Sequence, residues 1–501
     1  MATTNQTFKL TKRIKVILLI ISLAGLAAYL FCNRLPCVCG KIFNNAKCKE
    51  DHYIEGKVFI DKCDGAIRDS FVRNIRVKCN EFIVDPTHPD AQKYRDSLTA
   101  RCFKKVKICD CTPAFELWAN PDGHPIDAGT VASNTMLGRP YGATPGGLMP
   151  NLVINLNPGP ELKDPNNLDS FNSTSILCNL NIPQQNGMII AIVDTGIDTI
   201  TDPNLNWLHA FNWDKYHASD RCIYNTSNFG INILKQKIEP IDSLGHGTAV
   251  NGVSSGASLP NYKDLYLDLS FLNVGIFDAN SNSCTLFNAL CGLNYSIHQN
   301  AKIINISWGF DFNPKDEFLK QCVEKTITDI ITSAPHILFI AGLGNDSVSI
   351  SSTRSFYPAC LAANIDNLMA IGSLSWNSQD LAGFSNYAIK EIMTLSMKGD
   401  RILSTYPDYL LQFNPGPVIG QRKMVSGTSF STPLVSRVAA SFWIRNNSLT
   451  PAQVKKHFIN YLDPIAVQSN LHPGLTIRTL NINQISGLVC SPPILDPLIL
   501  Y

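Results

Sequence analysis

The run Met188-Ile-Ile-Ala-Ile-Val-Asp194-Thr-Gly is unbroken apolar sequence that ends on a carboxylate. Runs of this kind are typical of strands buried on both faces of a parallel sheet. Four more follow it, at Leu272–Phe277, Lys302–Ile306, His336–Ala341 and Leu368–Ile371. Helix-like stretches lie between them, at residues 246–257, 284–299, 315–333 and 429–445. Because strands and helices alternate, we expect an α/β fold in which helices flank a layered parallel sheet.

Three reactive residue types stand where this fold would place a site, at the ends of strands and the starts of helices. Asp194 closes the first run, while His246 and Ser429 each open a predicted helix after a glycine-containing turn. A serine hydroxyl is a weak nucleophile that needs a base within hydrogen-bond reach. A histidine can take that proton and return it, and a buried carboxylate can orient the imidazole. The three residues together predict nucleophilic catalysis by Ser429.

Two further segments also follow predicted strands. Asn345, in Gly342-Leu-Gly-Asn345, carries an amide that could donate to an oxyanion, with the backbone N–H of Ser429 as a second donor. Ser307-Trp308-Gly309 could pair its backbone with an extended peptide. We therefore expect a polypeptide substrate.

In this order the motifs resemble those of the subtilisin-like serine proteases, the subtilase family. The residues that carry the resemblance are Asp194-Thr-Gly-Ile-Asp198, Gly245-His246-Gly-Thr, Gly344-Asn345 and Gly427-Thr-Ser429 followed by Pro433. The resemblance covers roughly residues 188–485. It implies a serine endopeptidase that works through a Ser429 acyl-enzyme, with Asp194 and His246 completing the triad and Asn345 in the oxyanion hole. It also implies that Ser307, Trp308 and Gly309 line the primary substrate pocket.

The sequence departs from the family pattern at several positions near these motifs. Ala249 stands where the family usually has a second histidine, and Asn251 where it has alanine. Phe430-Ser431 replaces the usual Met-Ala after the nucleophile. These differences motivate the alternative of a catalytically silent subtilase scaffold that serves as a binding or surface protein. An α/β-hydrolase esterase is disfavoured, because Ser429 lacks the Gly-x-Ser-x-Gly elbow.

Composition excludes several other classes of function. The 501 residues are 45% hydrophobic and 16% charged, which is typical of a folded chain with a large core. The 42 basic and 40 acidic residues give a net charge of +2, so nothing indicates a nucleic-acid partner. The predicted triad requires no cofactor. Calcium often stabilises members of the family, but the sequence contains no recognisable loop of clustered calcium ligands.

The N-terminus predicts contact with a membrane. Residues 16–32 form a 17-residue uncharged stretch behind a basic flank, within residues 1–35 that we expect to act as a signal anchor or a cleaved signal peptide. The peptidase domain would then lie outside the cytoplasm, anchored or secreted. Asn345-Asp-Ser347 also fits the N-glycosylation pattern, and a glycan there would consume the proposed oxyanion amide. Either the site stays unmodified because it is buried on folding, or the host does not glycosylate in this way, and the second explanation favours a bacterial cell envelope as the location.

Sixteen cysteines agree with an oxidising compartment. Eight fall between Cys37 and Cys111 and could form four disulfides, or the pairs Cys37/Cys39 and Cys109/Cys111 could hold zinc. The seven later cysteines are odd in number, so at least one is free or pairs across domains. We expect a Cys-rich unit at 40–118, either prodomain-like or permanent. A Pro/Gly/Asn-rich linker at 119–187, the peptidase domain at 188–490 and an apolar tail at 491–501 complete the chain.

Overall fold

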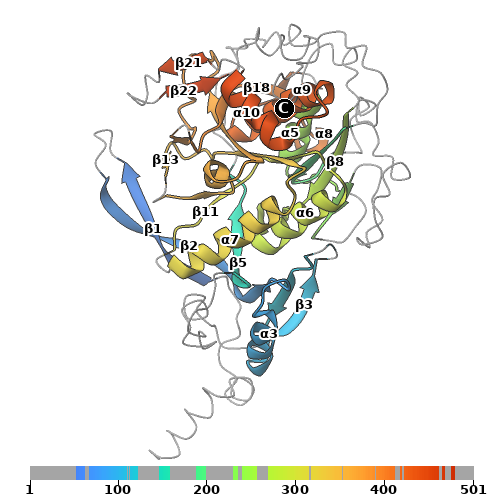
Figure 1. Ribbon diagram of the computed structural model, residues 1–501, viewed down its shortest axis with the longest axis vertical. Coiled ribbons are helices and arrows are strands. Elements are labelled where there is room, and N and C mark those ends of the chain that lie inside the picture. Colours follow the sequence, from blue (N-terminus) through green and yellow to red (C-terminus); the bar gives the residue numbers. More distant parts are fainter. Residues whose placement is uncertain are drawn as a thin grey trace, which may run out of the picture.

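The computed structural model describes the chain in segments (Figure 1). They are residues 52–61, 67–109, 111, 113–121, 146–157, 188–198, 230–234, 240–256, 269–314, 317–351, 354–389, 391–411, 418–419, 422–461, 465–468 and 476–479. Our predictions for residues 1–35 and for the tail at 491–501 lie outside these segments. Among the described residues, no helix combines the length and the apolar character needed to cross a bilayer.

A nine-stranded sheet forms the centre of the larger domain, in the order β21-β22-β17-β15-β12-β10-β6-β8-β7. Its strands are β6 (Met188–Asp194), β7 (Gly230–Asn232), β8 (Leu269–Gly275), β10 (Ile303–Ile306), β12 (Leu338–Gly342), β15 (Leu368–Leu374), β17 (Leu395–Lys398), β21 (Ile465–Gln468) and β22 (Thr476–Thr479). Every pairing in this sheet is parallel except that of β21 with β22. The five predicted strands are confirmed as β6, β8, β10, β12 and β15.

Helices cover both faces of this sheet and divide the core in two (Figure 1). The helices α6 (Leu286–His298) and α7 (Glu317–Thr332) pack on one face, and α5 (His246–Ser255) and α9 (Thr428–Arg445) pack on the other. All four coincide with predicted helical stretches. The strands between them are almost fully buried, as the continuous apolar runs required.

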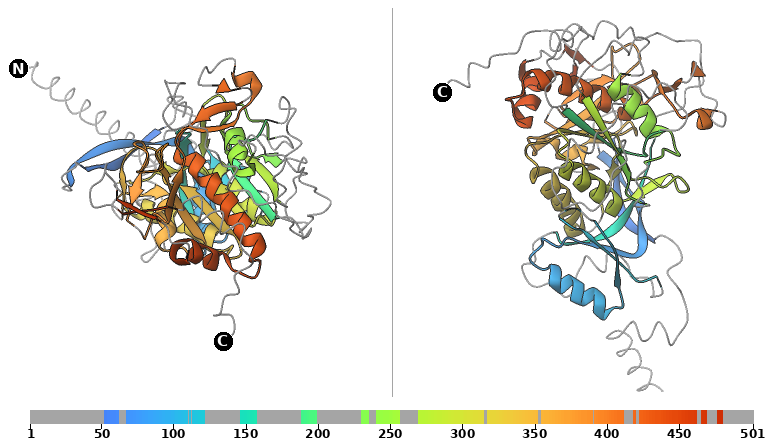
Figure 2. Two further views of the ribbon diagram at one scale, coloured as in Figure 1. Left: turned by 90° about the horizontal axis from the view of Figure 1, so that it is seen from above. Right: turned by 90° about the vertical axis from the view of Figure 1, so that its right-hand side faces the viewer.

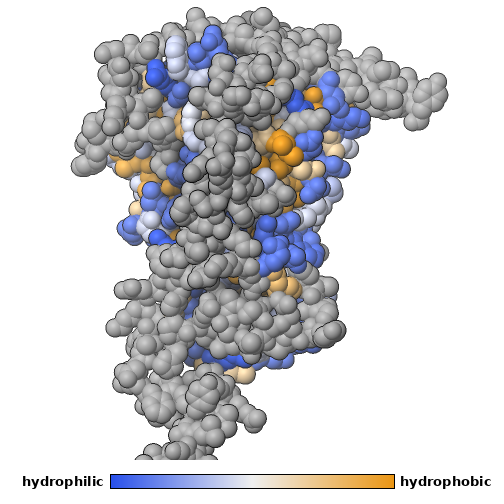
Figure 3. All heavy atoms as spheres, turned by 90° about the vertical axis from the view of Figure 1, so that its left-hand side faces the viewer, coloured by the Kyte–Doolittle hydropathy of each residue, from blue (hydrophilic) through white to orange (hydrophobic). Residues whose placement is uncertain are grey.

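Shorter elements surround the main layers. They are β9 (Ser283–Thr285), β11 (Phe310–Asp311), β13 (Ser349–Ile350), β14 (Phe356–Tyr357), η5 (Ala359–Ala363), β16 (Tyr387–Ala388), β18 (Ile402–Thr405), α8 (Asp408–Leu411), β19 (Val418–Ile419), β20 (Arg422–Val425), α10 (Pro451–Lys456) and η6 (His457–Tyr461). The described surface on the face in Figure 3 is mostly hydrophilic, with hydrophobic side chains in small patches.

A smaller N-terminal unit forms an antiparallel sheet in the order β3-β4-β2-β5, with β1 paired to β2 (Figure 2). Its elements are β1 (His52–Asp61), β2 (Ile67–Val84), α3 (Ala91–Ala100), β3 (Lys104–Ile108), β4 (Glu116–Ala119) and β5 (Leu148–Asn155). The helix α3 lies against this sheet over a small core that includes Phe82, Leu98, Phe103 and Trp118. On its other side the sheet joins the core formed by α6 and α7.

The strand β5 corrects the prediction of a linker at residues 119–187, which is wrong for Leu148–Asn155. This strand lies between β2 and β9 and pairs antiparallel with both, so it continues the N-terminal sheet into the larger domain. Met149, Leu152 and Ile154 are buried there, which explains how a segment flanked by turn-forming residues becomes a strand.

A disulfide between Cys109 and Cys291 also joins the two units, across 182 residues of sequence. Cys109 follows β3 and Cys291 lies on α6, so one of the later cysteines does pair across domains. The zinc alternative is wrong for Cys109 and Cys111, because both sulfur atoms are in disulfides and neither can be a thiolate ligand. Cys37 and Cys39 lie outside the described residues.

Candidate active site

Asp194 and His246 form a buried acid–imidazole pair at the carboxyl edge of the sheet. Asp194 is the last residue of β6 and His246 the first residue of α5. The Nδ1 atom of His246 lies 2.7 Å from Oδ1 of Asp194, and both side chains are buried. Burial by itself lowers the pKa of His246, but the charge and hydrogen bond of Asp194, helped by the charge of Asp242, raise it above its usual value overall.

Asp242 holds this pair in place, although the sequence analysis assigned it no role. Its buried carboxylate accepts hydrogen bonds from the backbone N–H groups of Gly245 and Thr248 and from the hydroxyls of Thr195 and Thr248. It thereby ties the residue after Asp194 to the first turn of α5. The available signal was an acid within the turn that precedes a helix, where a carboxylate can accept from free backbone N–H groups.

The nucleophile candidate Ser429 begins α9 behind Gly427, whose φ of 151° is favourable only for glycine. Its hydroxyl donates to the carbonyl oxygen of Ser307 at 2.9 Å, and the Ser307 hydroxyl donates back to the carbonyl oxygen of Ser429 at 2.8 Å. These reciprocal bonds join the start of α9 to the segment after β10.

The structure does not contain the hydrogen bond between Ser429 and His246. The buried Nε2 atom of His246 has no hydrogen-bond partner. The starts of α5 and α9 nevertheless contact each other, because the ring centroid of Phe430, the residue after Ser429, lies 5.5 Å from that of His246. Phe430, one of the departures from the family pattern, therefore packs against the imidazole. Hydrogen bonds of this kind are often long or unmade in the absence of substrate and tighten when it binds.

The amide of Asn345 is oriented by the first turn of α9. Its Oδ1 atom accepts hydrogen bonds from the backbone N–H of Thr428 at 2.9 Å and from the Thr428 hydroxyl at 3.1 Å. The Nδ2 atom therefore points away from α9 and donates to the carbonyl oxygen of Asn157 at 3.0 Å. The Asn345 amide N–H thus donates to a peptide carbonyl in the pocket that Ser429 also lines, which is consistent with its predicted role as an oxyanion donor.

Asn386 supports the loop that carries Asn345, although the sequence analysis assigned it no role. Its Oδ1 atom accepts from the backbone N–H groups of Asp346 and Val348, and its Nδ2 atom donates to the carbonyl oxygen of Leu343. Within this loop Gly344 adopts a φ of 102°, a backbone conformation that favours glycine. This conformation lets the backbone of the loop run close to the pocket.

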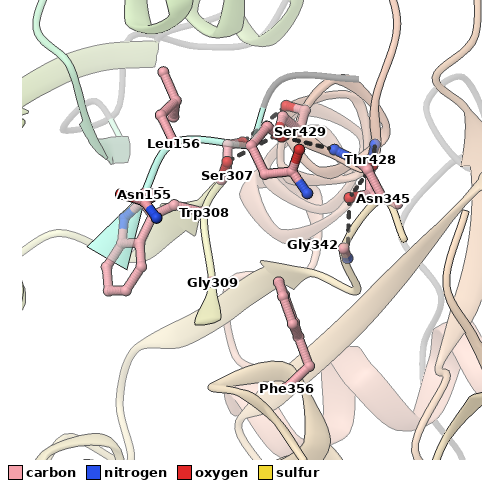
Figure 4. Close-up of a pocket in the computed structure, with 12 residues that line it drawn as sticks. Asn155, Leu156, Ser307, Trp308, Gly309, Gly342, Asn345, Phe356, Thr428 and Ser429 are labelled. Atoms are coloured by element: carbon pink, nitrogen blue, oxygen red, sulfur yellow. Dashed lines mark hydrogen bonds between the residues drawn. The ribbon is translucent and has the colours of Figure 1, made fainter. Parts of the chain in front are cut away.

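A pocket brings most of the predicted residues together (Figure 4). It is lined by Asn155, Leu156, Asn157, Ser307, Trp308, Gly309, Gly342, Gly344, Asn345, Phe356, Thr428 and Ser429. The predicted substrate-binding residues thus adjoin the predicted nucleophile and oxyanion donor. Trp308 is fixed in this wall because its indole N–H donates to the carbonyl oxygen of Val193 at 2.9 Å.

The chain's own segment Asn155–Asn157 forms part of the pocket lining. It begins at Asn155, the last residue of β5, so the pairing of β5 with β9 brings it to the pocket. Leu156 is buried, and the carbonyl of Asn157 is the one held by Asn345. The sequence analysis missed this segment because nothing in Asn155-Leu-Asn157 itself marks it as a ligand.

Within the described residues, no group of three or more His, Cys, Asp or Glu side chains is placed to hold a metal ion. Calcium therefore remains an expectation that comes from the family resemblance alone.

Comparison with known proteins agrees with this geometry. The family model described as "Subtilase family" matches residues 185–473, which is more than half of the chain. This chain belongs to the subtilase family. Members of this family are serine peptidases that act on polypeptides, and the fold is the subtilisin-like α/β fold with a parallel sheet.

The similar subtilases are distant relatives. The cell wall-associated protease of Bacillus subtilis (strain 168) is 26% identical over 287 residues, which are 57% of this chain and 26% of that protein. Subtilisin-like protease 2 of Plasmodium falciparum (isolate 3D7) is 28% identical over 262 residues, which are 50% of this chain and 17% of that protein. The matched region thus spans about a quarter or less of these relatives.

Among solved structures, the chain is similar to fervidolysin from Fervidobacterium pennivorans, a keratinolytic enzyme related to subtilisin. The TM-score is 0.53 at 15% sequence identity, with 90% of this chain and 65% of that chain covered. At this identity the likeness supports the fold alone.

Proposed function

We propose that this subtilase is a serine endopeptidase. Ser429 attacks a peptide carbonyl while His246 takes its proton, and His246 then returns the proton to the leaving nitrogen. A water activated by the same imidazole hydrolyses the resulting acyl-enzyme. Asp194 orients His246 and stabilises its charged form, while Asn345 and the Ser429 N–H hold the oxyanion. The observation that carries the proposal is the Asn345 amide donating to a peptide carbonyl in the pocket that Ser429 lines.

We also propose that the N-terminal unit acts as a prodomain-like plug in the state described. The segment Asn155–Asn157 lines the pocket beside Ser429, and the carbonyl of Asn157 accepts a hydrogen bond from the Asn345 amide. The pairing of β5 and the Cys109–Cys291 disulfide hold the unit against the larger domain. Cutting the chain after this segment would leave the unit covalently attached. A peptide substrate must therefore displace the segment.

The protein is proposed to act outside the cytoplasm, either secreted or anchored through residues 16–32, and the bacterial cell envelope remains the proposed compartment. A disulfide between two buried cysteines supports an oxidising compartment, because disulfides are rare in reducing ones. N-terminal sequencing of the mature protein would test the anchor, since a retained residue 1–35 segment is expected for an anchor and a lost one for a cleaved signal.

The endopeptidase proposal is tested by labelling the full-length protein with a fluorophosphonate and by casein digestion. A second full-length protein, with Asn155, Leu156 and Asn157 all changed to glycine, removes the side chains of the plug and is called the open variant. We expect the open variant to label and digest faster than the wild type. Ser429→Ala in either background should abolish labelling and lower kcat by about 10⁶-fold. Absence of labelling in the open variant would refute the proposal.

The alternative, a silent scaffold that binds without cleaving, is favoured by one observation. The Ser429 hydroxyl donates to Ser307 while Nε2 of His246 has no partner. Casein turnover that disappears with Ser429→Ala would exclude this alternative. A folded open variant that neither labels nor digests would support it.

A further inference from the structure

The pocket beside Ser429 has an aromatic base. Its two walls are Ser307–Gly309 and Gly342–Asn345, and Phe356 lies between them at the bottom (Figure 4). A Cβ atom built on Gly309 would lie 2.3 Å from Cε1 of Phe356, and one built on Gly344 would lie 2.9 Å from its Cζ. The phenyl ring therefore touches both backbone walls and fills the space that the two glycines leave.

Phe356 is held rigidly in this position. It belongs to β14, which pairs antiparallel with β11 directly behind the Ser307–Gly309 wall, and residue 356 is opposite Asp311. Its side chain is buried, and the neighbouring Tyr357 is fully buried. The base of the pocket is thus part of a two-stranded sheet, and the ring is buried against the backbone of Gly309 and Gly344.

The segment that lines the pocket indicates which substrate residue would bind in it. The Asn345 amide donates to the carbonyl of Asn157, and on this contact we align residue 157 with the residue before a cleaved bond. The side-chain amide of Asn157 donates to Oδ1 of Asp346 at 3.1 Å, at the exposed rim of the pocket. The backbone N–H of Asp346 is fixed by Asn386, so the position of this acceptor is set by the loop.

From these contacts we propose that Phe356 is the specificity-determining residue of the enzyme, and that it restricts the residue before the cleaved bond to short side chains. Asp346 adds a preference for a short hydrogen-bond donor such as asparagine over aspartate. Large aromatic and long aliphatic side chains are excluded because the phenyl ring occupies the volume they need. This inference rests on the proposed endopeptidase function.

The test measures kcat/KM of the open variant on peptides that differ only in the residue before the cleaved bond, which is Asn, Ala, Asp, Leu or Phe. We expect kcat/KM for the Asn and Ala peptides to exceed that for the Leu and Phe peptides by at least about tenfold, a difference that exclusion by pocket size can produce. Phe356→Val and Phe356→Ala should raise kcat/KM for Leu and Phe progressively, with Phe gaining at least about tenfold in Phe356→Ala.

Two further variants separate the rim from the base. Asp346→Ala should lower the preference for Asn over Ala by up to about tenfold. We expect this small effect because Asp346 lies at the exposed rim, where a hydrogen bond to a charged group contributes little. Phe310→Leu is the matched control: Phe310 packs against Tyr357 but does not line the pocket, so the order of preference should not change.

The outcomes distinguish the pocket from the function. Fluorophosphonate labelling of each variant reports a working Ser429 independently of peptide choice. The pocket proposal is wrong, and the peptidase proposal stands, if the labelled open variant cleaves the Phe and Leu peptides as fast as the Asn peptide. The same conclusion follows if Phe356→Ala is labelled normally but its kcat/KM for the Phe and Leu peptides does not increase. If the open variant neither labels nor cleaves any peptide, the peptidase proposal itself fails.

Discussion

At the scale of single residues, the chemistry depends on the charge state of His246. Its pKa is raised because the negative charges of Asp194 and Asp242 outweigh the effect of burial. Only the neutral imidazole can accept the proton of Ser429. Activity should therefore rise with pH through a pKa above the usual value for histidine, and it should be lost as the pH falls below that value.

Asp194→Asn tests this dependence. The substitution removes the charge that raises the pKa of His246 and leaves the effect of burial, so the acidic limb of the kcat/KM profile should move to lower pH. The rate at the pH optimum should fall by about 10⁴-fold, because an asparagine amide cannot replace the carboxylate in stabilising the reactive tautomer of His246 or the imidazolium that forms during the reaction. The pH profile of the open variant with and without Asp194→Asn provides the measurement. An unmoved limb would mean that Asp194 does not control His246.

At the scale of elements, the start of α5 decides where His246 lies. Gly245 precedes it with a φ of 84°, a conformation that side chains with a Cβ rarely adopt. A Cβ atom on this residue would also lie 2.3 Å from Cζ of Tyr406, whose hydroxyl donates to the carbonyl oxygen of Leu244. The helix can therefore begin at His246 only with glycine before it.

Gly245→Ala should lower the free energy of unfolding by about 1–3 kcal/mol, the usual range for forced left-handed backbone, and it should also reduce fluorophosphonate labelling. Urea unfolding measures the first effect. Gly383→Ala is the matched control, because a Cβ atom there would have no neighbour within 4 Å. If both variants unfold at the same urea concentration as the parent, the strain argument is wrong.

At the scale of the whole molecule, the Cys109–Cys291 disulfide closes a loop across 182 residues. Cross-linking such distant residues restricts the unfolded chain, so it should stabilise the joined units by roughly 2–5 kcal/mol in the chain-entropy account. The double variant Cys109→Ser with Cys291→Ser should therefore show a lower Tm. Its cleft should also label more readily, because the plug is then held only by β5 and by packing.

Thermal unfolding and fluorophosphonate labelling of the full-length protein make this measurement. Cys360→Ala is the control, since Cys360 is a free thiol that takes no part in the disulfide. A double variant that labels no faster than the wild type would show that the disulfide does not help to hold the plug.

Much of the large domain was predictable from the sequence, because its signals are local. The runs that became β6, β8, β10, β12 and β15 are buried on both faces, so they are apolar without interruption. By contrast, β17 has the sequence Leu-Ser-Met-Lys, and its polar residues hid a strand that is fully buried. The types and order of Asp194, His246 and Ser429 were equally local, since each stands in a short motif at the end of a strand or the start of a helix.

The sequence by itself determined the alternation of strands and helices, the identity of the reactive groups and the family to which the chain belongs. Only the tertiary structure decided that β5 pairs with β9, that Cys109 bonds to Cys291, and that Asn157 and Phe356 meet in one pocket. The physical reason is range. Periodicity and motifs report what a residue requires of its immediate neighbours, whereas these contacts join segments more than a hundred residues apart, and they form only when the packed sheets bring those segments together.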